Sequence, residues 1–276
     1  MTSDIKILNH LPALKNQITR VAIEAGAKTL EFFEETGTSS EVLEKQDGSP
    51  VTLADQEAEK IIESSLCDIT PSVPILGEEA VADNRIADIQ GHEYFWLVDP
   101  LDGTKEFISG KGEFTVNIAL IKGSEPVMGV VYAPYMGELY ASAGPGTATR
   151  WLEETESEKT IHVRSAPKEG VTVIGSRRHG DNEKMDAFLS SFKVAKFIKR
   201  GSSLKICAVA AGKADIYPRF GPTCEWDTAA ADAVLRAAGG IMVHADTKSS
   251  LVYGKVTEKF YNPEFIAISD PAFLQE

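Results

Sequence analysis

The sequence predicts an α/β protein in which an α+β amino half precedes an α/β carboxyl half. The first half combines two helical patterns with short apolar runs joined by tight turns, as in an antiparallel meander. In the second half strands and helices alternate, which is typical of an α/β domain. We expect the halves to be residues 1–150 and 151–276, because the clearest change of composition follows Gly144.

Composition limits the class of protein and its partners. The 276 residues are 43% hydrophobic and 25% charged, as in ordinary globular proteins. A formal net charge of −13 disfavours binding to nucleic acid polymers, so we expect a small-molecule partner.

The sequence also predicts a cellular location. No apolar run approaches the roughly 20 residues of a membrane span, and the first residues lack an export signal, so we expect a cytoplasmic protein without a transmembrane anchor. Three cysteines without paired spacing fit a reducing compartment. Peripheral association with the inner membrane, and the choice between monomer and homodimer, stay open.

Two amphipathic helices are expected first, over residues 11–33 and 54–66. In each, apolar residues recur every three or four positions. Thr52 and Asp55 fit a capping box at the start of the second helix, which is the simplest function of Asp55. A short strand over 73–76 then ends at Gly77-Glu78-Glu79.

Further strands are expected along the rest of the chain. They are residues 94–98, 114–121, 127–132, 138–141, 171–175, 194–198, 214–218, 241–243 and 265–268. Helices are expected over 181–191, 202–211 and 226–238, with Asp227 as the N-cap of the last. The stretch from Gly144 through the acidic residues 153–158 is interpreted as a flexible surface loop.

The most informative stretch joins an apolar strand to two carboxylates and a bend. Asp99 and Asp102 follow the strand over 94–98, and Pro100 and Gly103 favour a turn between it and a short helix starting at Thr104. Carboxylates, a carbonyl and a helix amino end suit Mg²⁺ with a bound phosphate. The plainer alternative is a turn in which Asp102 only caps the short helix.

Carboxylates stand at the ends of several predicted elements. These residues are Asp55, Glu78, Asp99, Asp102 and Asp227. If folding gathers them, their repulsion requires cations or raised pKa values. Two divalent ions about 3.5–4 Å apart would activate water and stabilise the leaving oxygen of a phosphoryl group. The chain has no Walker loop, nucleophile elbow or His-Glu-x-x-His motif.

Three motifs in order resemble the signatures of the inositol monophosphatase superfamily of lithium-sensitive, Mg²⁺-dependent phosphatases. They are Gly77-Glu78-Glu79, Asp99-Pro100-Leu101-Asp102-Gly103-Thr104 and Trp226-Asp227-Thr228-Ala229-Ala230. Longer runs, including residues 96–107, 201–205 and 217–223, are similar to CysQ-type 3′(2′),5′-bisphosphate nucleotidases.

The resemblance implies a layered α-β-α-β-α sugar-phosphatase fold with the site between its halves. It implies two or three Mg²⁺ ions, inhibition by Li⁺, and a set of metal ligands: Glu78, Asp99, the carbonyl of Leu101, Asp102 and Asp227. Thr104 would hold the attacking water and Asp55 would take its proton, while the amides of Gly103 and Thr104 hold the phosphate. Glu79 would support a ligand or assist the same water.

Substrate choice would depend on the second half. Gly201-Ser202-Ser203 opens a helix with Lys205 one turn in, which is a second place for an anion. The resemblance implies that His179, Ser202, Lys205 and Arg219 face a nucleotide and its 5′-phosphate. Alternatively, Ser202 is a plain N-cap, Lys205 a surface charge and His179 a loop residue.

The expected activity is therefore hydrolysis of the 3′-phosphate of adenosine 3′,5′-bisphosphate, and of its sulfated precursor, which would clear a by-product of sulfate assimilation. Two alternatives stay open. The first is an inositol or sugar monophosphatase with the same metal ligands, and the second is a noncatalytic metal and nucleotide sensor.

Overall fold

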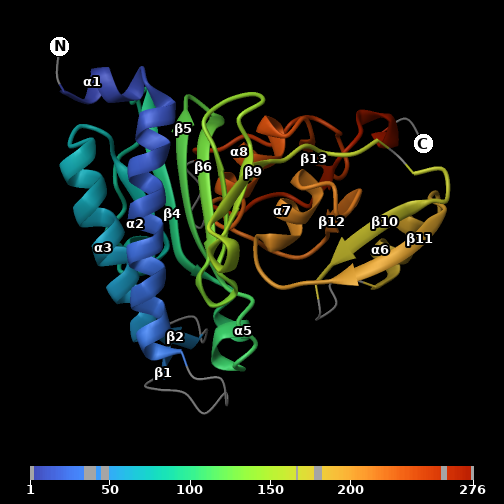
Figure 1. Cartoon of the computed structure of the whole chain (residues 1–276), viewed down its shortest axis with the longest axis horizontal. Coiled ribbons are helices and arrows are strands. Elements are labelled where there is room, and N and C mark those ends of the chain that lie inside the picture. The colour runs from blue at the N-terminus through green and yellow to red at the C-terminus, as the bar shows by residue number, and fades with distance from the viewer. Residues whose placement is uncertain are drawn as a thin grey trace.

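The computed structural model describes residues 3–33, 42–44, 50–165, 167–176, 182–255 and 260–274. Helices and sheets alternate in layers (Figure 1): α2 and α3 cover one face of a seven-stranded sheet, and α7 and α8 separate its other face from a five-stranded sheet. Helix α6 lies against the outer face of the second sheet, where Phe188 and Leu189 pack. The layered α-β-α-β-α arrangement expected from the sequence is confirmed.

The elements have the following bounds. The α-helices are α1 Ser3–Leu8, α2 Leu11–Phe32, α3 Leu53–Ile69, α4 Glu78–Ala82, α5 Thr104–Ile108, α6 Asn182–Leu189, α7 Leu204–Ala210 and α8 Ala229–Ala237. The strands are β1 Val42–Glu44, β2 Pro50–Thr52, β3 Ile75–Gly77, β4 Tyr94–Asp102, β5 Thr115–Lys122, β6 Glu125–Ala133, β7 Glu138–Ser142, β8 Thr149–Leu152, β9 Ser157–Thr160, β10 Val171–Gly175, β11 Val194–Lys199, β12 Ile216–Arg219, β13 Ile241–His244 and β14 Phe265–Ile268. Short 3₁₀ turns are η1 Pro134–Met136, η2 Glu153–Thr155 and η3 Pro271–Leu274.

The seven-stranded sheet runs from β3 to β9 in sequence order. Strands β3 and β4 pair in parallel and every later neighbour is antiparallel, as the meander pattern predicts. The prediction of a flexible loop after Gly144 was wrong for part of that stretch, because β8 and β9 extend the sheet as a hairpin. Most of β9 is exposed, so its residues carry no apolar pattern that would indicate a strand.

The first helical layer follows directly from the amphipathic patterns. Leu14 and Ile18 of α2 and Ile62 of α3 are fully buried against apolar residues of the seven-stranded sheet, among them Trp96. The Trp96 indole donates a hydrogen bond to the Thr70 hydroxyl (2.9 Å), which satisfies its buried N–H.

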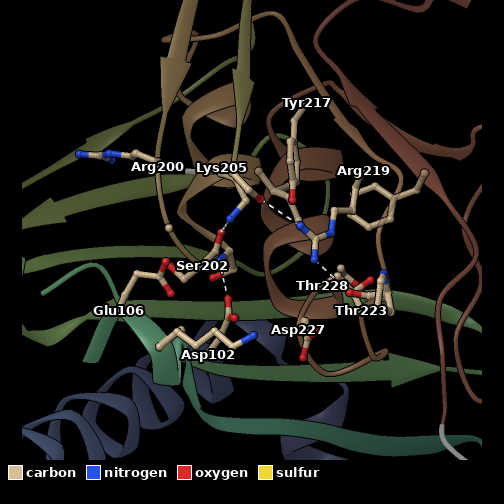
Figure 2. A pocket seen from close by; sticks show the side chains of 18 residues that line it. Asp102, Glu106, Arg200, Ser202, Lys205, Tyr217, Arg219, Thr223, Asp227 and Thr228 are labelled. Atoms are coloured by element: carbon tan, nitrogen blue, oxygen red, sulfur yellow. Dashed lines mark hydrogen bonds between the residues drawn. The ribbon is translucent and has the colours of Figure 1, made fainter. Parts of the chain in front are cut away.

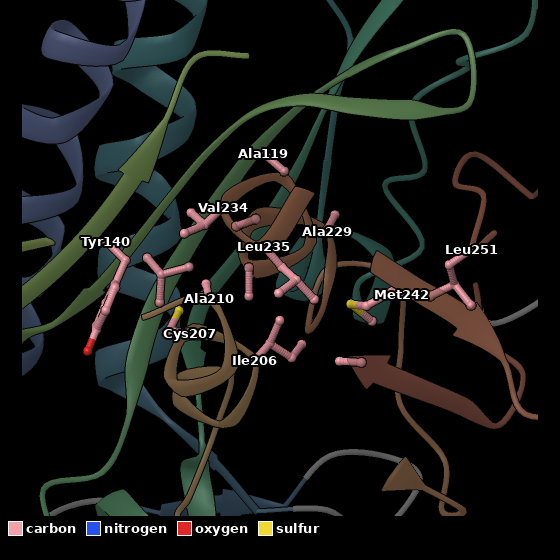
Figure 3. Packing of buried hydrophobic residues seen from close by; sticks show 14 of the residues in the cluster. Ala119, Tyr140, Ile206, Cys207, Ala210, Ala229, Val234, Leu235, Met242 and Leu251 are labelled. Carbon is pink, nitrogen blue, oxygen red and sulfur yellow. The ribbon is translucent and has the colours of Figure 1, made fainter. Parts of the chain in front are cut away.

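The middle layer is built from small residues. Ala229 and Val234 of α8, and Ile206 and Cys207 of α7, belong to one buried cluster between the two sheets (Figure 3). Helix α8 lies so close to β6 that a Cβ at Gly129 would be 2.2 Å from the Ala230 carbonyl oxygen. The alanine-rich sequence of α8 thus allows the close approach that brings its preceding loop, with Asp227, to the site.

The five-stranded sheet has the order β11-β10-β12-β14-β13, with β10 parallel to both neighbours and β14 antiparallel to both of its own. At its inner end Asp215 is fully buried and accepts two hydrogen bonds from Arg164, to Oδ1 and Oδ2, each 2.7 Å long. The Thr172 amide donates a third bond to the same carboxylate. Such a bidentate pair offsets the cost of burying the charge.

Within the described residues, no helix is long and apolar enough to cross a membrane.

Candidate metal and substrate site

The site begins where β3 ends beside β4. The parallel register pairs Gly77 of β3 with Val98 of β4. The next residues along the two strands, Glu78 and Asp99, therefore lie side by side at the same edge of the sheet. Glu78 then opens α4, while Asp99 continues into the bend that leads to α5. Two carboxylates far apart in sequence are therefore neighbours because of strand pairing alone.

The bend after Asp99 is fixed by short-range contacts. The Leu101 amide donates to Asp99 Oδ1 (2.9 Å), and the pairing of β4 with β5 is irregular between Asp99 and Asp102. Gly103 has φ 97°, and a Cβ there would be 3.0 Å from the Glu113 carbonyl oxygen, so glycine is required. The Thr104 hydroxyl donates to the Leu101 carbonyl (3.3 Å).

Asp227 reaches the same place from the loop before α8. Its Oδ2 accepts a hydrogen bond from the Cys224 amide (2.9 Å). The prediction that Asp227 caps α8 was wrong, because Thr228 is the N-cap residue, although its side chain makes no capping bond. The Asn262 amide group holds this loop by donating to the Cys224 carbonyl (2.6 Å) and the Thr228 hydroxyl (3.0 Å). Asp227 is thus left to face the acidic residues of the first sheet.

Three carboxylates meet closely enough to share a cation. Oxygens of Glu78, Asp99 and Asp227 all lie within 4.8 Å of one another. Burial raises the pKa of Asp99, and repulsion from Glu78, Asp102 and Asp227 raises it further. Burial and the charges of Asp102 and Glu78 likewise raise the pKa of Asp227.

A divalent cation fits this cluster. Asp99 Oδ2 is buried and has no hydrogen-bond partner among the described residues, an arrangement that costs free energy unless a ligand compensates it. Carboxylate oxygens are hard ligands of the kind that Mg²⁺ takes, together with water and substrate phosphate. The same cation would relieve the repulsion that raises the pKa values.

Asp102 and Leu101 stand beside the three clustered carboxylates rather than within them. Asp102 Oδ2 accepts a hydrogen bond from the Ser203 amide, which is 101 positions away. Burial raises the pKa of Asp102 to about 6, against the effects of nearby Lys205 and of that bond. The capping alternative for Asp102 was wrong, since Gly103 is the N-cap residue of α5. Asp102 still lies near the cluster, because its negative charge raises the pKa values of both Asp99 and Asp227.

Asp55 and Glu79 are both buried near the acidic cluster, with exposures of 2% and 5%. Asp55 lies in the first turn of α3, and the preceding Ala54 shares a buried cluster with Leu101 and Phe107, which places α3 beside the bend. The capping box remains a prediction, because the Thr52 side chain lies outside the described part.

Glu59 is a buried residue that sequence reasoning missed. Its Oε2 accepts a hydrogen bond from the Glu79 amide (2.9 Å) and its Oε1 one from the Ala80 amide (2.6 Å). Burial raises the pKa of Glu59 to about 8, although both amides favour the carboxylate. The available signal was its spacing, since a glutamate four residues after Asp55 lies on the same buried helix face.

A cavity of about 230 Å³ opens directly from the acidic cluster. Asp102 and Asp227 form one side, and Lys205 and Arg219 lie opposite them (Figure 2). Arg200 and Lys105 also line this cavity, as do Glu106 and Tyr217. An acidic region that suits a metal therefore adjoins a positively charged side, formed by Lys205 and Arg219 and called the cationic wall below, that suits an anion.

The cationic wall is held by specific contacts. Lys205 is buried and donates to the Ser202 carbonyl, and its ammonium lies 5.5 Å from the centre of the Tyr217 ring. Burial lowers the pKa of Lys205 to about 8, and nearby Arg219 lowers it further, against the pull of Asp102. Arg219 donates to the Ser176 hydroxyl and the Pro222 carbonyl, both at 3.0 Å. The surface-charge alternative for Lys205 was wrong.

Ser202 and Ser203, next to the cationic wall, differ in backbone conformation and in hydrogen bonding. Ser202 has φ 46°, a strained value for serine, and Ser203 is the N-cap residue of α7. The capping alternative for Ser202 holds in part, because its hydroxyl accepts a long hydrogen bond (3.5 Å) from the amide of Leu204, the first residue of α7. Ser203 was missed as a site residue: its hydroxyl donates to Asn117 Oδ1 (2.8 Å) and lies 2.9 Å from the Thr115 hydroxyl. His179 lies outside the described residues.

The fold and the acidic cluster define a class. A profile of the inositol monophosphatase family matches residues 14–270, and the chain belongs to this family. It is 45% identical over 251 residues to the 3′(2′),5′-bisphosphate nucleotidase CysQ of Escherichia coli (strain K12), covering 91% of this chain and 97% of that protein.

Solved structures of members of the same family are similar to this chain. The crystal structure of CysQ from Bacteroides thetaiotaomicron, a bacterial member of the inositol monophosphatase family, has a TM-score of 0.75 at 36% identity, covering 92% of this chain and 97% of that one. An inositol monophosphatase from Anabaena has a TM-score of 0.73 at 25% identity, covering 96% and 93%.

Proposed function

We propose that this protein is a Mg²⁺-dependent phosphatase that removes the 3′-phosphate of adenosine 3′,5′-bisphosphate, giving AMP and phosphate. Its sulfated precursor would lose the same phosphate. The observation that carries the proposal is that Asp227 of the acidic cluster and its neighbour Asp102 line the same cavity as Lys205 and Arg219. A bisphosphate nucleotide needs both, since one phosphate goes to the metal and the other to Lys205 and Arg219.

The metal would be held by Glu78, Asp99, Asp102 and Asp227 with the carbonyl of Leu101, as two or three ions. Bound Mg²⁺ would make a water more acidic and neutralise charge on the phosphate. The amides of Gly103 and Thr104 would bind the scissile phosphate where the left-handed turn at Gly103 opens α5.

The chain's own residues would then orient and deprotonate water. The Thr104 hydroxyl, which already contacts the Leu101 carbonyl, would hold the attacking water, and Asp55 would accept its proton. Glu79, buried beside Glu78, would support this arrangement or assist the same water. No side-chain nucleophile is required for this direct displacement.

Substrate selection would depend on the second half of the chain. We propose that residues 1–150 hold the metal and most of the catalytic groups, and that residues 151–276 supply Asp227 and the nucleotide contacts. Ser202, Lys205 and Arg219 would bind the 5′-phosphate, together with His179. The closeness to CysQ nucleotidases supports this substrate over an inositol phosphate.

The setting of this reaction is also a proposal. We expect the protein to act in the cytoplasm on a small nucleotide, as a monomer or homodimer, and to serve sulfate assimilation. Peripheral association with the inner membrane stays open.

A comparison of two substrates tests the proposal. Phosphate release is measured from adenosine 3′,5′-bisphosphate and from inositol 1-phosphate with Mg²⁺, with and without Li⁺. We expect the nucleotide to be preferred and Li⁺ to inhibit. A preference for inositol 1-phosphate would overturn the substrate, and no phosphate release from either would favour a noncatalytic sensor.

A further inference from the structure

Helices α3 and α4 are tied together by one buried side chain. Glu59 of α3 is 2% exposed, and its two carboxylate oxygens accept hydrogen bonds from consecutive amides of α4, those of Glu79 and Ala80. These amides belong to the first turn of α4, where backbone N–H groups have no partner inside the helix. Glu59 therefore fixes both the position and the direction of the turn that begins with Glu78.

The Glu59 carboxylate also packs closely against the backbone at the end of β3. Gly77 precedes α4, and a Cβ at this position would be 2.7 Å from the Glu59 carboxyl carbon. The backbone of Gly77 has φ −103°, which any residue adopts, so glycine is required here by the close approach of Glu59 and not by its own conformation. The chain thus packs the end of β3 directly against this carboxylate.

Glu59 also links two parts of the site. It lies four residues after Asp55 on α3, so both side chains project from one face of that helix. Asp55 lies in the first turn of α3, next to Ala54, which packs with Leu101. Glu59 holds the first turn of α4, which carries Glu78. The distance between the proposed proton acceptor and the proposed metal ligand is therefore set through α3.

We infer that Glu59 is a positioning residue that orients Glu78 and Glu79 toward the metal and keeps them in register with Asp55. The inference rests on the proposed metal site, and Glu59 itself touches neither metal nor substrate. Outer contacts that orient metal ligands contribute roughly 10–100-fold to metal affinity.

The test measures the binding of Mn²⁺ to the full chain without substrate, with electron paramagnetic resonance as the readout. Glu59→Gln replaces one acceptor oxygen by an N–H donor that faces a backbone amide, so we expect the Kd for Mn²⁺ to rise about tenfold. Glu57→Gln is the matched control, because Glu57 is on the same helix and forms a solvent-exposed pair with Lys60. It should bind Mn²⁺ as the wild type does.

A second variant reaches the same contact from the opposite side. Gly77→Ala displaces the Glu59 carboxylate without changing any acidic residue, and it should also raise the Kd for Mn²⁺. With saturating Mg²⁺, phosphate release by both variants should recover only in part, because the metal site is refilled while its register with Asp55 stays altered. Circular dichroism establishes that each variant is folded at the temperature used.

The outcomes separate this inference from the metal site. Weaker Mn²⁺ binding by folded Glu59→Gln or Gly77→Ala, with Glu57→Gln unchanged, supports the inference. Wild-type affinity in folded variants, even with a lower unfolding temperature, overturns the inference alone and makes Glu59 purely structural. A wild-type protein that binds no Mn²⁺ overturns the proposed metal site and this inference with it.

Discussion

The backbone amide of Ser203 donates a hydrogen bond to Asp102 Oδ2, and this bond joins the seven-stranded sheet to the start of α7. One oxygen of Asp102 is thereby engaged, and the negative charge of Asp102 raises the pKa values of Asp99 and Asp227 in the acidic cluster. The Ser203 hydroxyl is itself held by Asn117 of β5. The bond between Ser203 and Asp102 therefore connects the side of the cavity that we propose binds metal with the side that we propose binds substrate.

Asp102→Asn should abolish activity without unfolding the protein. The asparagine carbonyl can still accept the Ser203 amide, but one negative charge beside the metal is lost. We expect phosphate release from adenosine 3′,5′-bisphosphate to fall by more than the roughly 100-fold that outer contacts of a metal site contribute. Asp88→Asn, at an exposed aspartate, is the control and should keep full activity. Retained activity in Asp102→Asn would remove this residue from the ligand set.

Asp99→Asn should stabilise the metal-free protein while destroying its metal site. The pKa of Asp99 is raised in the fold, so the ionised carboxylate costs stability as the pH rises above its ordinary value of 3.8. A neutral amide removes this cost, and we expect the free energy of unfolding at pH 7 in EDTA to rise by about 1 kcal/mol. Thermal unfolding with and without Mg²⁺ measures both effects. A less stable metal-free variant would contradict the repulsion that we assign to this cluster.

Nucleotide binding should weaken as the pH rises through about 8. Burial lowers the pKa of Lys205 to about 8, so the ammonium that we propose attracts the 5′-phosphate is lost above that value. At one pH unit above its pKa about a tenth of the group stays charged, which corresponds to an affinity about tenfold lower. Calorimetric titration with adenosine 5′-phosphate at pH 7 and 9 measures this change.

Lys205→Arg is the control for this pH dependence. An arginine stays charged over the whole range, so its affinity for adenosine 5′-phosphate should change little between pH 7 and 9. Equal pH dependence in the wild type and in Lys205→Arg would assign the titration to another group.

The sequence predicted those parts of the site that depend on local pattern. Asp99 and Asp102 come directly after the apolar run 94–98, and Glu78 follows another apolar run, so their place at strand ends could be inferred before their meeting was known. The observed β4 continues through Asp102, beyond the apolar run. Parallel pairing of β3 with β4 then brings Glu78 beside Asp99. Periodicity predicted the helices that cover the first sheet, whereas the layered fold as a whole was implied by the resemblance carried by three motifs.

Other parts were not predictable because they depend on contacts between distant segments. Asp227 has the residue type and position of an N-cap, yet its Oδ2 accepts the Cys224 amide. Glu59 is a glutamate on a helix, which usually indicates an exposed position, and only its contact with α4 explains its burial. Strand β9 is a mostly exposed edge strand, so it lacks the apolar alternation that indicates a strand.

The buried pair of Arg164 and Asp215 should contribute far more to stability than an exposed pair of equal length. Asp215 is fully buried and Arg164 partly so, whereas Lys60 and Glu57 form a solvent-exposed pair, and the shortest N–O distance is 2.7 Å in both. Arg164→Met leaves the Asp215 carboxylate buried with only the Thr172 amide as a described partner, so we expect a loss of about 3 kcal/mol. Lys60→Met should cost less than about 1 kcal/mol.

Denaturant unfolding of these variants measures the difference, and the double variant Arg164→Met/Asp215→Asn identifies its cause. If the loss comes from an uncompensated buried charge, removing that charge as well should restore part of the stability. Neither residue lines the cavity, so the folded variants should hydrolyse phosphate at the wild-type rate. A double variant no more stable than Arg164→Met would show that lost hydrogen bonds and packing, rather than the isolated charge, account for the effect.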